Sequence, residues 1–214
     1  MFCLGPRGEY LHIEENDTIR LVYSIHQTKA LILDVMDVGE SNKFYWLLTR
    51  EYGLVNASAQ GVRLVKSKLN PYLQQYGFVI IEFVKGKEIW RITNAAPETS
   101  FYFSQLTKKS EEVVAKISLL LKRLYVGEES NEVLFDDLLD GFQKLSKAFD
   151  SKTVDALEIV IIIKILYHLG YWEDHKGHYQ LHLSSYSQEV LEKALQKKKD
   201  LRERITQSLR ESHL

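Results

Sequence analysis

The stretch "TKALILDVMDVGESNKFYWLLTREYGLVNASA", residues 28–59, decides the fold class of this chain. It holds three apolar, β-branched or aromatic runs, at 30–38, 43–49 and 54–59, and a glycine lies in each gap between them. Runs of this length, bounded by glycine and polar residues, predict β-strands. Two further runs, at 76–84 and 88–93, lie on either side of the tight turn at 85–87. Five short, evenly spaced strands within about 65 residues predict an OB-type β-barrel.

The apolar pattern becomes helical after Pro97. Segments 111–125, 131–149 and 153–170 repeat apolar residues three and four apart, which predicts three helices, the first capped by Ser110. The third is apolar on nearly all sides and should be the buried central helix. Residues 187–214 predict one or two charged amphipathic helices. We therefore expect an α+β fold: an N-terminal five-stranded OB-type β-barrel, followed by an α-helical domain.

The domain boundaries follow from these changes of pattern. We expect an N-terminal extension at 1–22 with a strand at Tyr10–Ile13, a barrel domain at 23–97 and a helical domain at 98–214. The extension contains two glycines, a proline and an acidic run, and it need not fold with the rest.

Composition limits the function classes. The chain has 214 residues and a formal net charge of −1, so its bulk charge predicts no nucleic-acid binding. Its one cysteine, Cys3, excludes an internal disulfide and fits a reducing cytoplasm. The longest apolar run, 159–166, is interrupted by Lys164 and is shorter than the ~20 residues of a membrane span. The N-terminus lacks a signal-peptide pattern. We expect a cytoplasmic protein with no membrane partner.

Motifs for nucleotide or acyl chemistry are missing. The sequence contains no GxxxxGK[ST], no GxSxG and no HExxH, so it predicts neither a phosphate-cradling loop nor these hydrolytic sites.

Positive charge gathers in one part of the chain. Residues 28–97 contain nine Lys and Arg against six Asp and Glu, a net charge of +3. Nucleic-acid-binding barrels combine cations that track phosphates with aromatic faces that stack on bases. We predict a DNA-binding site on the turn after Gly61 and at the two ends of the strand at 43–49. Its residues are Lys43, Arg50, Arg63, Lys66 and Lys68.

The aromatic residues of that strand admit a second interpretation. If Phe44, Trp46 and Leu48 alternate inward as barrel core, only Tyr45 is available to stack on a base. We prefer this interpretation for the aromatic residues, while the cluster of cations has no such structural explanation.

Three other clusters are weaker candidates. His175, His178 and His182 have a spacing at which imidazoles can bind zinc, but the flexible turn at Gly177 favours solvated histidines. The carboxylates of 136, 137 and 140 could hold a divalent metal, but their spacing favours the solvated face of a helix. The basic residues at 197–199, 202 and 204 form either a solvated helix face or a phosphate-contacting face.

Four motifs in order carry a family resemblance. They are Thr28–Leu33, Gly39–Lys43, Leu48–Gly53 and Gly61–Ser67, and together they resemble the N-terminal domain of the RecO family of bacterial recombination mediators. The segment "ILYHLGY" at 165–171 is similar to the family's central helix. The resemblance implies an OB barrel packed on a helical domain, and a protein that binds single- and double-stranded DNA and anneals complementary strands. It also implies that the protein acts with RecR and the single-strand-binding protein to promote RecA loading, close to the nucleoid. The resemblance further implies a protein that is not an enzyme and uses no cofactor, which is consistent with the missing phosphate-cradling loop.

The chain departs from the family at one place. Many members carry a four-cysteine zinc module after the Leu-Gly-Tyr helix, where this chain has "WEDHKGHYQLH", so we predict no structural zinc. The resemblance also implies a groove in the helical domain for the acidic C-terminal tail of the single-strand-binding protein, with Lys122, Arg123 or Lys164 as its cation. The alternative is an OB-fold protein-interaction adaptor without direct DNA binding, which the near-neutral charge and the missing zinc module favour. A zinc-dependent hydrolase is a third and more distant hypothesis.

Overall fold

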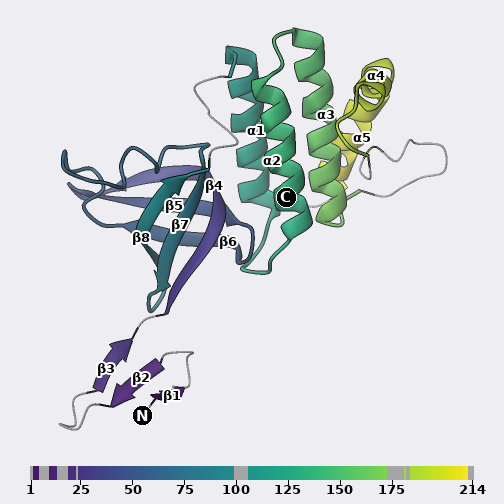
Figure 1. Cartoon of the computed structure of the whole chain (residues 1–214). Coiled ribbons are helices and arrows are strands. Elements are labelled where there is room, and N and C mark those ends of the chain that lie inside the picture. Colours follow the sequence, from purple (N-terminus) through teal and green to yellow (C-terminus); the bar gives the residue numbers. More distant parts are fainter. Residues whose placement is uncertain are drawn as a thin grey trace.

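A computed structural model describes residues 2–4, 10–13, 19–22, 24–98, 106–172, 181 and 184–211. Within these ranges a β-barrel lies beside a bundle of helices (Figure 1). Strands β1 (Phe2–Leu4), β2 (Tyr10–Ile13) and β3 (Ile19–Val22) pair antiparallel as a separate sheet. The strand expected at Tyr10–Ile13 is β2. Among the described helices, none is both long enough and apolar enough to cross a membrane.

Five strands close the barrel in the order β4-β5-β6-β8-β7. They are β4 (Ile25–Val38), β5 (Asn42–Thr49), β6 (Gly53–Ala59), β7 (Phe78–Lys85) and β8 (Trp90–Pro97). Neighbours run antiparallel except β6 and β8, which pair in parallel through Ala57–Trp90 and Ser58–Arg91. A five-stranded Greek-key barrel of this kind is the OB fold. The predicted fold class is confirmed, although β4 starts five residues before the predicted strand.

The side chains of β5 point in the opposite directions to those predicted. Tyr45 and Leu47 are fully buried inside the barrel, whereas Phe44 and Trp46 point outward and are half-buried. Burial, together with the nearby Asp37, raises the pKa of the Tyr45 hydroxyl. Leu48 also points outward, but it is buried because it packs against the helices. Since β5 is covered on both sides, all its central residues are apolar, and the alternation that sets a strand's register is lost from the sequence.

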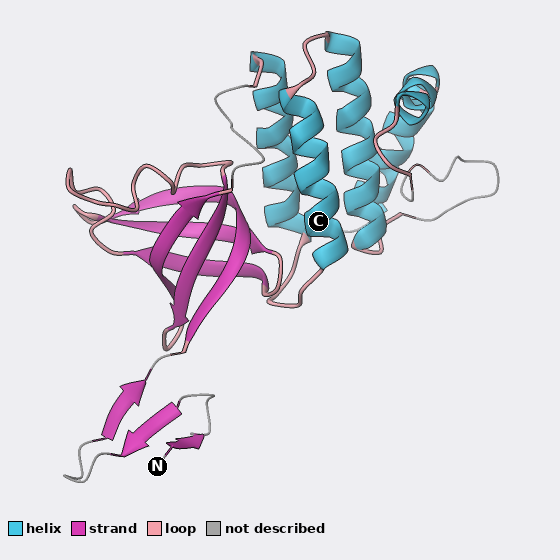
Figure 2. Cartoon of the chain, in the orientation of Figure 1, coloured by secondary structure: helices cyan, strands magenta, loops and turns pink. Residues whose placement is uncertain are grey.

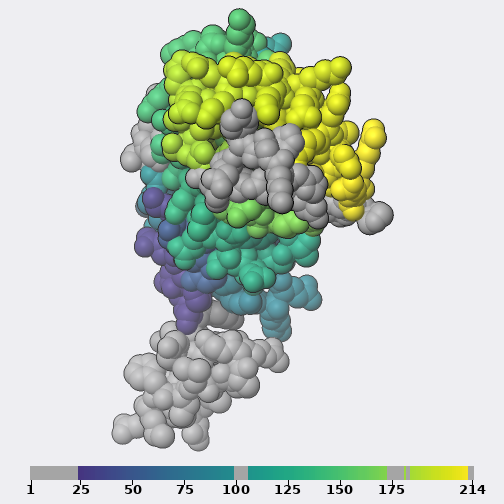
Figure 3. All heavy atoms as spheres, turned by 90° about the vertical axis from the view of Figure 1, so that its right-hand side faces the viewer, coloured from purple at the N-terminus to yellow at the C-terminus, as the bar shows by residue number. Residues whose placement is uncertain are grey.

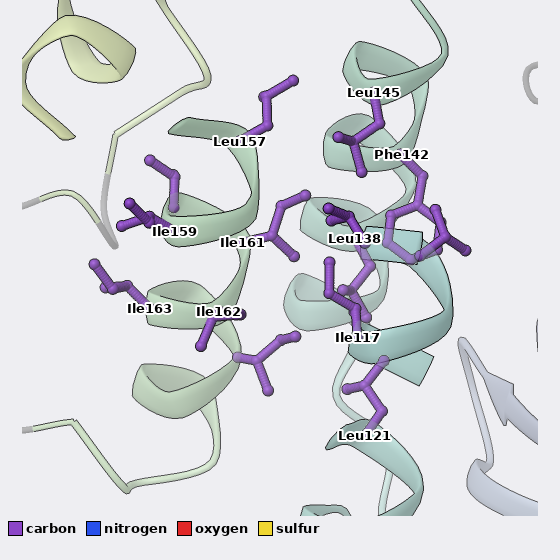
Figure 4. Packing of buried hydrophobic residues seen from close by; sticks show 14 of the residues in the cluster. Ile117, Leu121, Leu138, Phe142, Leu145, Leu157, Ile159, Ile161, Ile162 and Ile163 are labelled. Atoms are coloured by element: carbon purple, nitrogen blue, oxygen red, sulfur yellow. The ribbon is translucent and has the colours of Figure 1, made fainter. Parts of the chain in front are cut away.

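The helical part contains α1 (Lys108–Leu124), α2 (Glu132–Ser146), α3 (Ser151–His168), α4 (Gln188–Gln196) and α5 (Lys198–Glu211). The cap of α1 is Thr107, whose side chain accepts a hydrogen bond from the Ser110 backbone N–H, so the predicted cap at Ser110 is wrong. Helix α3 is buried from Ala156 to Leu166 without a break, as expected for the central helix. Figure 4 shows Ile161 of α3 facing Leu138 of α2. The yellow C-terminal helices cover the upper part of the face seen in Figure 3.

Apolar residues on the outside of the barrel pack with the helices in one cluster, which is separate from the core inside the barrel. The Phe78 ring of β7 lies edge-on to Phe135 and Phe142 of α2, with ring centroids 5.7 Å apart in each pair. The backbone N–H of Leu54 donates to the Gly127 carbonyl at 3.1 Å. Gly53 has a φ of +64°, and a Cβ there would overlap the Glu129 carbonyl. The helices are therefore held against one side of the barrel.

Candidate nucleic-acid interface

The connection between β6 and β7 carries most of the predicted DNA-binding cations, and its ends are fixed to the barrel. Val62 and Leu73 are almost completely buried in the barrel core. The Gly61 N–H donates to Asn42 Oδ1 at 2.9 Å, and the Arg63 N–H donates to the Ser41 carbonyl at 3.0 Å. We call residues 61–69 the basic loop. It lies against the turn between β4 and β5, among the loops at the left of the barrel in Figure 2.

Arg63 joins these two loops. Its Nη1 donates to the Gly39 carbonyl at 2.9 Å, and its Nη2 lies 3.4 Å from Asp37 Oδ2. The side chain is 37% exposed, so a solvent-facing part of the guanidinium remains open to a phosphate. Arg63 therefore has a structural role, and its charge is partly compensated.

Lys66 and Lys68 are the most available cations of the basic loop. Both residues are exposed, and neither makes an ion pair with another described residue. Lys43 lies at the start of β5, next to Asn42, and is half-buried, again with no ion pair inside the described ranges. The fold thus brings Lys43 and the three basic-loop cations to one end of the barrel.

Arg50 lies at the opposite end of β5 and has partners inside the molecule. Its Nε and Nη2 donate to the two carboxylate oxygens of Asp136, both at 2.9 Å, and its Nη1 lies 2.7 Å from Glu132 Oε2. The hydrogen bond with Asp136 raises the pKa of Arg50 above its ordinary value. Arg50 therefore fastens the barrel to α2 and is not part of the cation cluster at the basic loop. A role for it in DNA binding stays a prediction.

A second basic surface lies at the turn between β7 and β8, which sequence reasoning treated only as a turn. It is a hollow of about 420 Å³. Lys85 is partly engaged there, because its Nζ lies 3.2 Å from Glu128 and 5.2 Å from the centre of the Trp90 ring. The available signal was the Lys-Gly-Lys sequence of the turn, with Arg91 following. The lining residues are Ser58, Val84, Lys85, Gly86, Lys87, Glu88, Ile89 and Arg91.

A groove of about 500 Å³ runs between α1, α3 and α5. Its walls are mostly apolar, with Ile159 and Ile162 from α3 and Ile205 from α5. Arg123 and Lys116 of α1 and Arg202 of α5 supply positive charge. Glu158 also lines the groove and pairs with Lys116 and Arg202. The groove is therefore apolar with a basic rim.

Of the three cations expected to receive an acidic tail, only Arg123 lines this groove. Lys164 is 3% exposed, and its Nζ donates to Asp137 at 2.8 Å. Lys122 donates to Asp34 at 2.6 Å and covers the Trp46 ring at 3.7 Å. The prediction for Lys164 is wrong, because its charge is buried and holds the structure together. Lys122 already contacts Asp34 and Trp46, and its role in binding the tail stays a prediction.

The remaining candidates have structural explanations or lie outside the described residues. Asp137 is not on the solvated face of α2 as predicted, since it bonds Lys164 and His168. The basic segment at the start of α5 pairs with α3, for example through Lys198 and Asp155 at 2.6 Å. His175, His178 and His182 lie outside the described residues. Within the described ranges, no three His, Cys, Asp or Glu side chains gather as a metal site.

Comparisons with known proteins match the barrel residues to a known protein family. The family model described as "Recombination protein O N terminal" matches residues 24–101. A DNA repair protein RecO of Clostridium novyi is 30% identical over 155 residues, which cover 71% of this chain and 58% of that protein. Its counterpart in Halalkalibacterium halodurans is 26% identical over 125 residues, 58% of this chain and 49% of the relative. The RecO of Exiguobacterium sibiricum is 23% identical over 155 residues, which cover 68% of this chain and 57% of that protein. The chain thus spans about half the length of the curated relatives it matches.

Proposed function

We propose that the chain, whose barrel matches the RecO family model and whose relatives are RecO proteins, is a member of that family and acts in DNA repair and recombination as a mediator. It binds single- and double-stranded DNA, anneals single strands, and works with RecR and the single-strand-binding protein to promote RecA loading. It breaks no covalent bond and needs no cofactor. Its place is the cytoplasm, next to the nucleoid.

One observation carries the proposal. Lys43, Lys66 and Lys68 lie at one end of an OB barrel, as does the partly exposed Arg63. The three lysines make no ion pair with other described residues. A local cluster of cations without ion-pair partners among the described residues, on a chain of net charge −1, is complementary in charge to a polyanionic ligand such as DNA. Cations at this end would neutralise the backbone of a bound strand. Lower repulsion between two such strands lets complementary bases pair, which is the physical basis of annealing.

A salt titration tests DNA binding. Each phosphate contact on a single strand contributes about −0.7 to the slope of log affinity against log salt. With Lys43, Arg63, Lys66 and Lys68 in contact, we expect a slope of about −3, measured by fluorescence anisotropy of a labelled single strand. The same protein should speed the annealing of two complementary strands. A protein-interaction adaptor would show neither effect, and that outcome would replace our proposal with the alternative.

The groove between α1, α3 and α5 is the proposed site for the acidic C-terminal tail of the single-strand-binding protein. Its apolar walls suit apolar side chains, and Arg123, which is exposed and makes no ion pair with another described residue, suits a carboxylate.

We expect Arg123→Glu to weaken binding of a labelled tail peptide about tenfold (~1.4 kcal/mol). DNA affinity should stay unchanged. Lys147→Glu, an exposed reversal at the end of α2, is the control and should bind the peptide like the wild type. Equal binding by Arg123→Glu would remove the peptide from this groove.

A further inference from the structure

The tip of the basic loop presents two consecutive apolar side chains to solvent. Leu64 is 57% exposed and Val65 is 104% exposed. Isolated exposed apolar residues are ordinary on protein surfaces. Here, however, the two are adjacent and exposed on one loop, with Arg63 before them and Lys66 directly after them. The arrangement is a small apolar tip enclosed by cations.

The fold holds this tip in place. The Leu64 N–H donates to the Gly61 carbonyl at 3.1 Å, and the Ser67 N–H donates to the Leu64 carbonyl at 2.9 Å, so two consecutive turns enclose the tip. The contacts of Arg63 to Gly39 and Ser41 fix its base. A neighbouring side chain, Val62, is completely buried in the barrel. The chain thus buries one valine of this loop and directs the next apolar pair away from the protein.

We propose that Leu64 and Val65 insert between neighbouring bases of the DNA strand whose phosphates Lys66 and Lys68 bind. This inference rests on the proposed DNA binding and adds a role that the cations alone do not supply. A nucleic-acid strand offers both required chemistries: anionic phosphates for the lysines, and flat apolar base faces for Leu64 and Val65. Apolar side chains such as Leu and Ile are inserted between base steps by several proteins that bend DNA.

Insertion would also explain how annealing is assisted. Unstacking a base step costs free energy in a duplex, and it costs less in a single strand whose bases are already partly unstacked. The tip therefore favours single strands. By holding bases apart while the lysines hold the backbone, it leaves the pairing edges of those bases exposed to a complementary strand.

The test is a single-stranded oligonucleotide that contains 2-aminopurine, whose fluorescence rises when the base is unstacked. We expect the full chain to raise this fluorescence on binding. In the variant Leu64→Ser/Val65→Ser the lysines remain, so the salt slope should be unchanged, while the fluorescence rise should be lost. Affinity should fall about tenfold (~1.4 kcal/mol). The matched control is Val126→Ser/Val133→Ser, two valines of the helical part that are 81% and 64% exposed, and it should behave like the wild type.

The outcomes separate this inference from the function on which it rests. If the wild type binds DNA with the expected salt slope but leaves the 2-aminopurine signal flat, the insertion is wrong and the proposed function stands. If the serine variant raises the signal as the wild type does, Leu64 and Val65 are not the inserting residues, and the inference fails. If the wild type binds no DNA, the function and the inference fail together. An equal melting temperature of the variant and the wild type excludes misfolding as the cause of any loss.

Discussion

Replacing Asp137 with alanine should destabilise the protein by about 3 kcal/mol, one of the two largest effects that we expect. The Asp137 carboxylate accepts a hydrogen bond from Lys164 Nζ at 2.8 Å, and its other oxygen lies 2.9 Å from His168 Nε2. Lys164 is 3% exposed and lies in the second half of the central helix α3. Without Asp137 its ammonium group would lose this carboxylate while it stays buried, and removal of one partner of a buried pair is strongly destabilising.

Chemical denaturation of the variant measures this effect, and two further variants make it specific. Asp140→Ala removes a carboxylate one turn further along α2 that makes no ion pair with a described residue, so we expect a change of at most about 0.5 kcal/mol. The double variant Asp137→Leu/Lys164→Met replaces the pair by apolar residues and should recover most of the loss, because it leaves no lysine charge buried. If Asp137→Ala costs no more than Asp140→Ala, the pair does not support the fold.

The same pair sets a dependence of stability on pH. Burial opposes ionisation of Asp137, but the hydrogen bonds from His168 and Lys164 outweigh it and hold its pKa below the ordinary value of an aspartate. A carboxyl group with a lowered pKa in the folded state stabilises the protein fully above its unfolded-state pKa of about 3.9. That contribution is lost as the pH falls through the lower folded-state pKa. Stability should therefore decline below about pH 4, and it should decline less steeply in Asp137→Ala than in the wild type.

The sequence was sufficient to predict the barrel, the order of its strands along the chain and the central helix. Each of these depends on a local apolar pattern that one segment carries by itself. The facing of β5 could not be predicted in this way. Trp46 points outward, where Lys122 of α1 covers its ring, and a contact with a residue 76 positions further along the chain cannot be predicted from the local pattern of the strand.

The sequence also could not show which charged residues are paired in the folded protein. A pattern reveals where Arg50 and Lys66 occur, but not which of them meets a carboxylate. Arg50 is neutralised by Asp136, which lies 86 positions away in sequence, while Lys66 extends from a loop with no acidic neighbour in sequence. Only the folded arrangement separates a cation that joins two parts of the protein from one that remains available to a ligand.

Reversing the charge of the two most available cations, in Lys66→Glu/Lys68→Glu, should therefore lower the affinity for single-stranded DNA about 100-fold at low salt (~2.8 kcal/mol). Two phosphate contacts are lost, which should flatten the salt slope by about 1.4, and two carboxylates are added that repel the backbone. Both residues are exposed and lie outside the helices and strands, so the fold should be retained. The measurement is the salt titration of a labelled strand by fluorescence anisotropy.

Two controls decide whether position or total charge matters in this titration. Lys147→Glu/Lys152→Glu makes the same change of net charge at exposed residues near the turn between α2 and α3, and it should bind DNA nearly as the wild type does. Arg50→Ala removes a barrel cation that Asp136 and Glu132 already compensate, so it should lower the melting temperature, and an unchanged salt slope would remove Arg50 from the predicted DNA-binding residues. If Lys66→Glu/Lys68→Glu binds like the first control, the basic loop is not the DNA site. The hollow lined by Lys85, Lys87 and Arg91 would then be the remaining basic surface on the described part of the barrel, because it is the other place where cations gather around a depression.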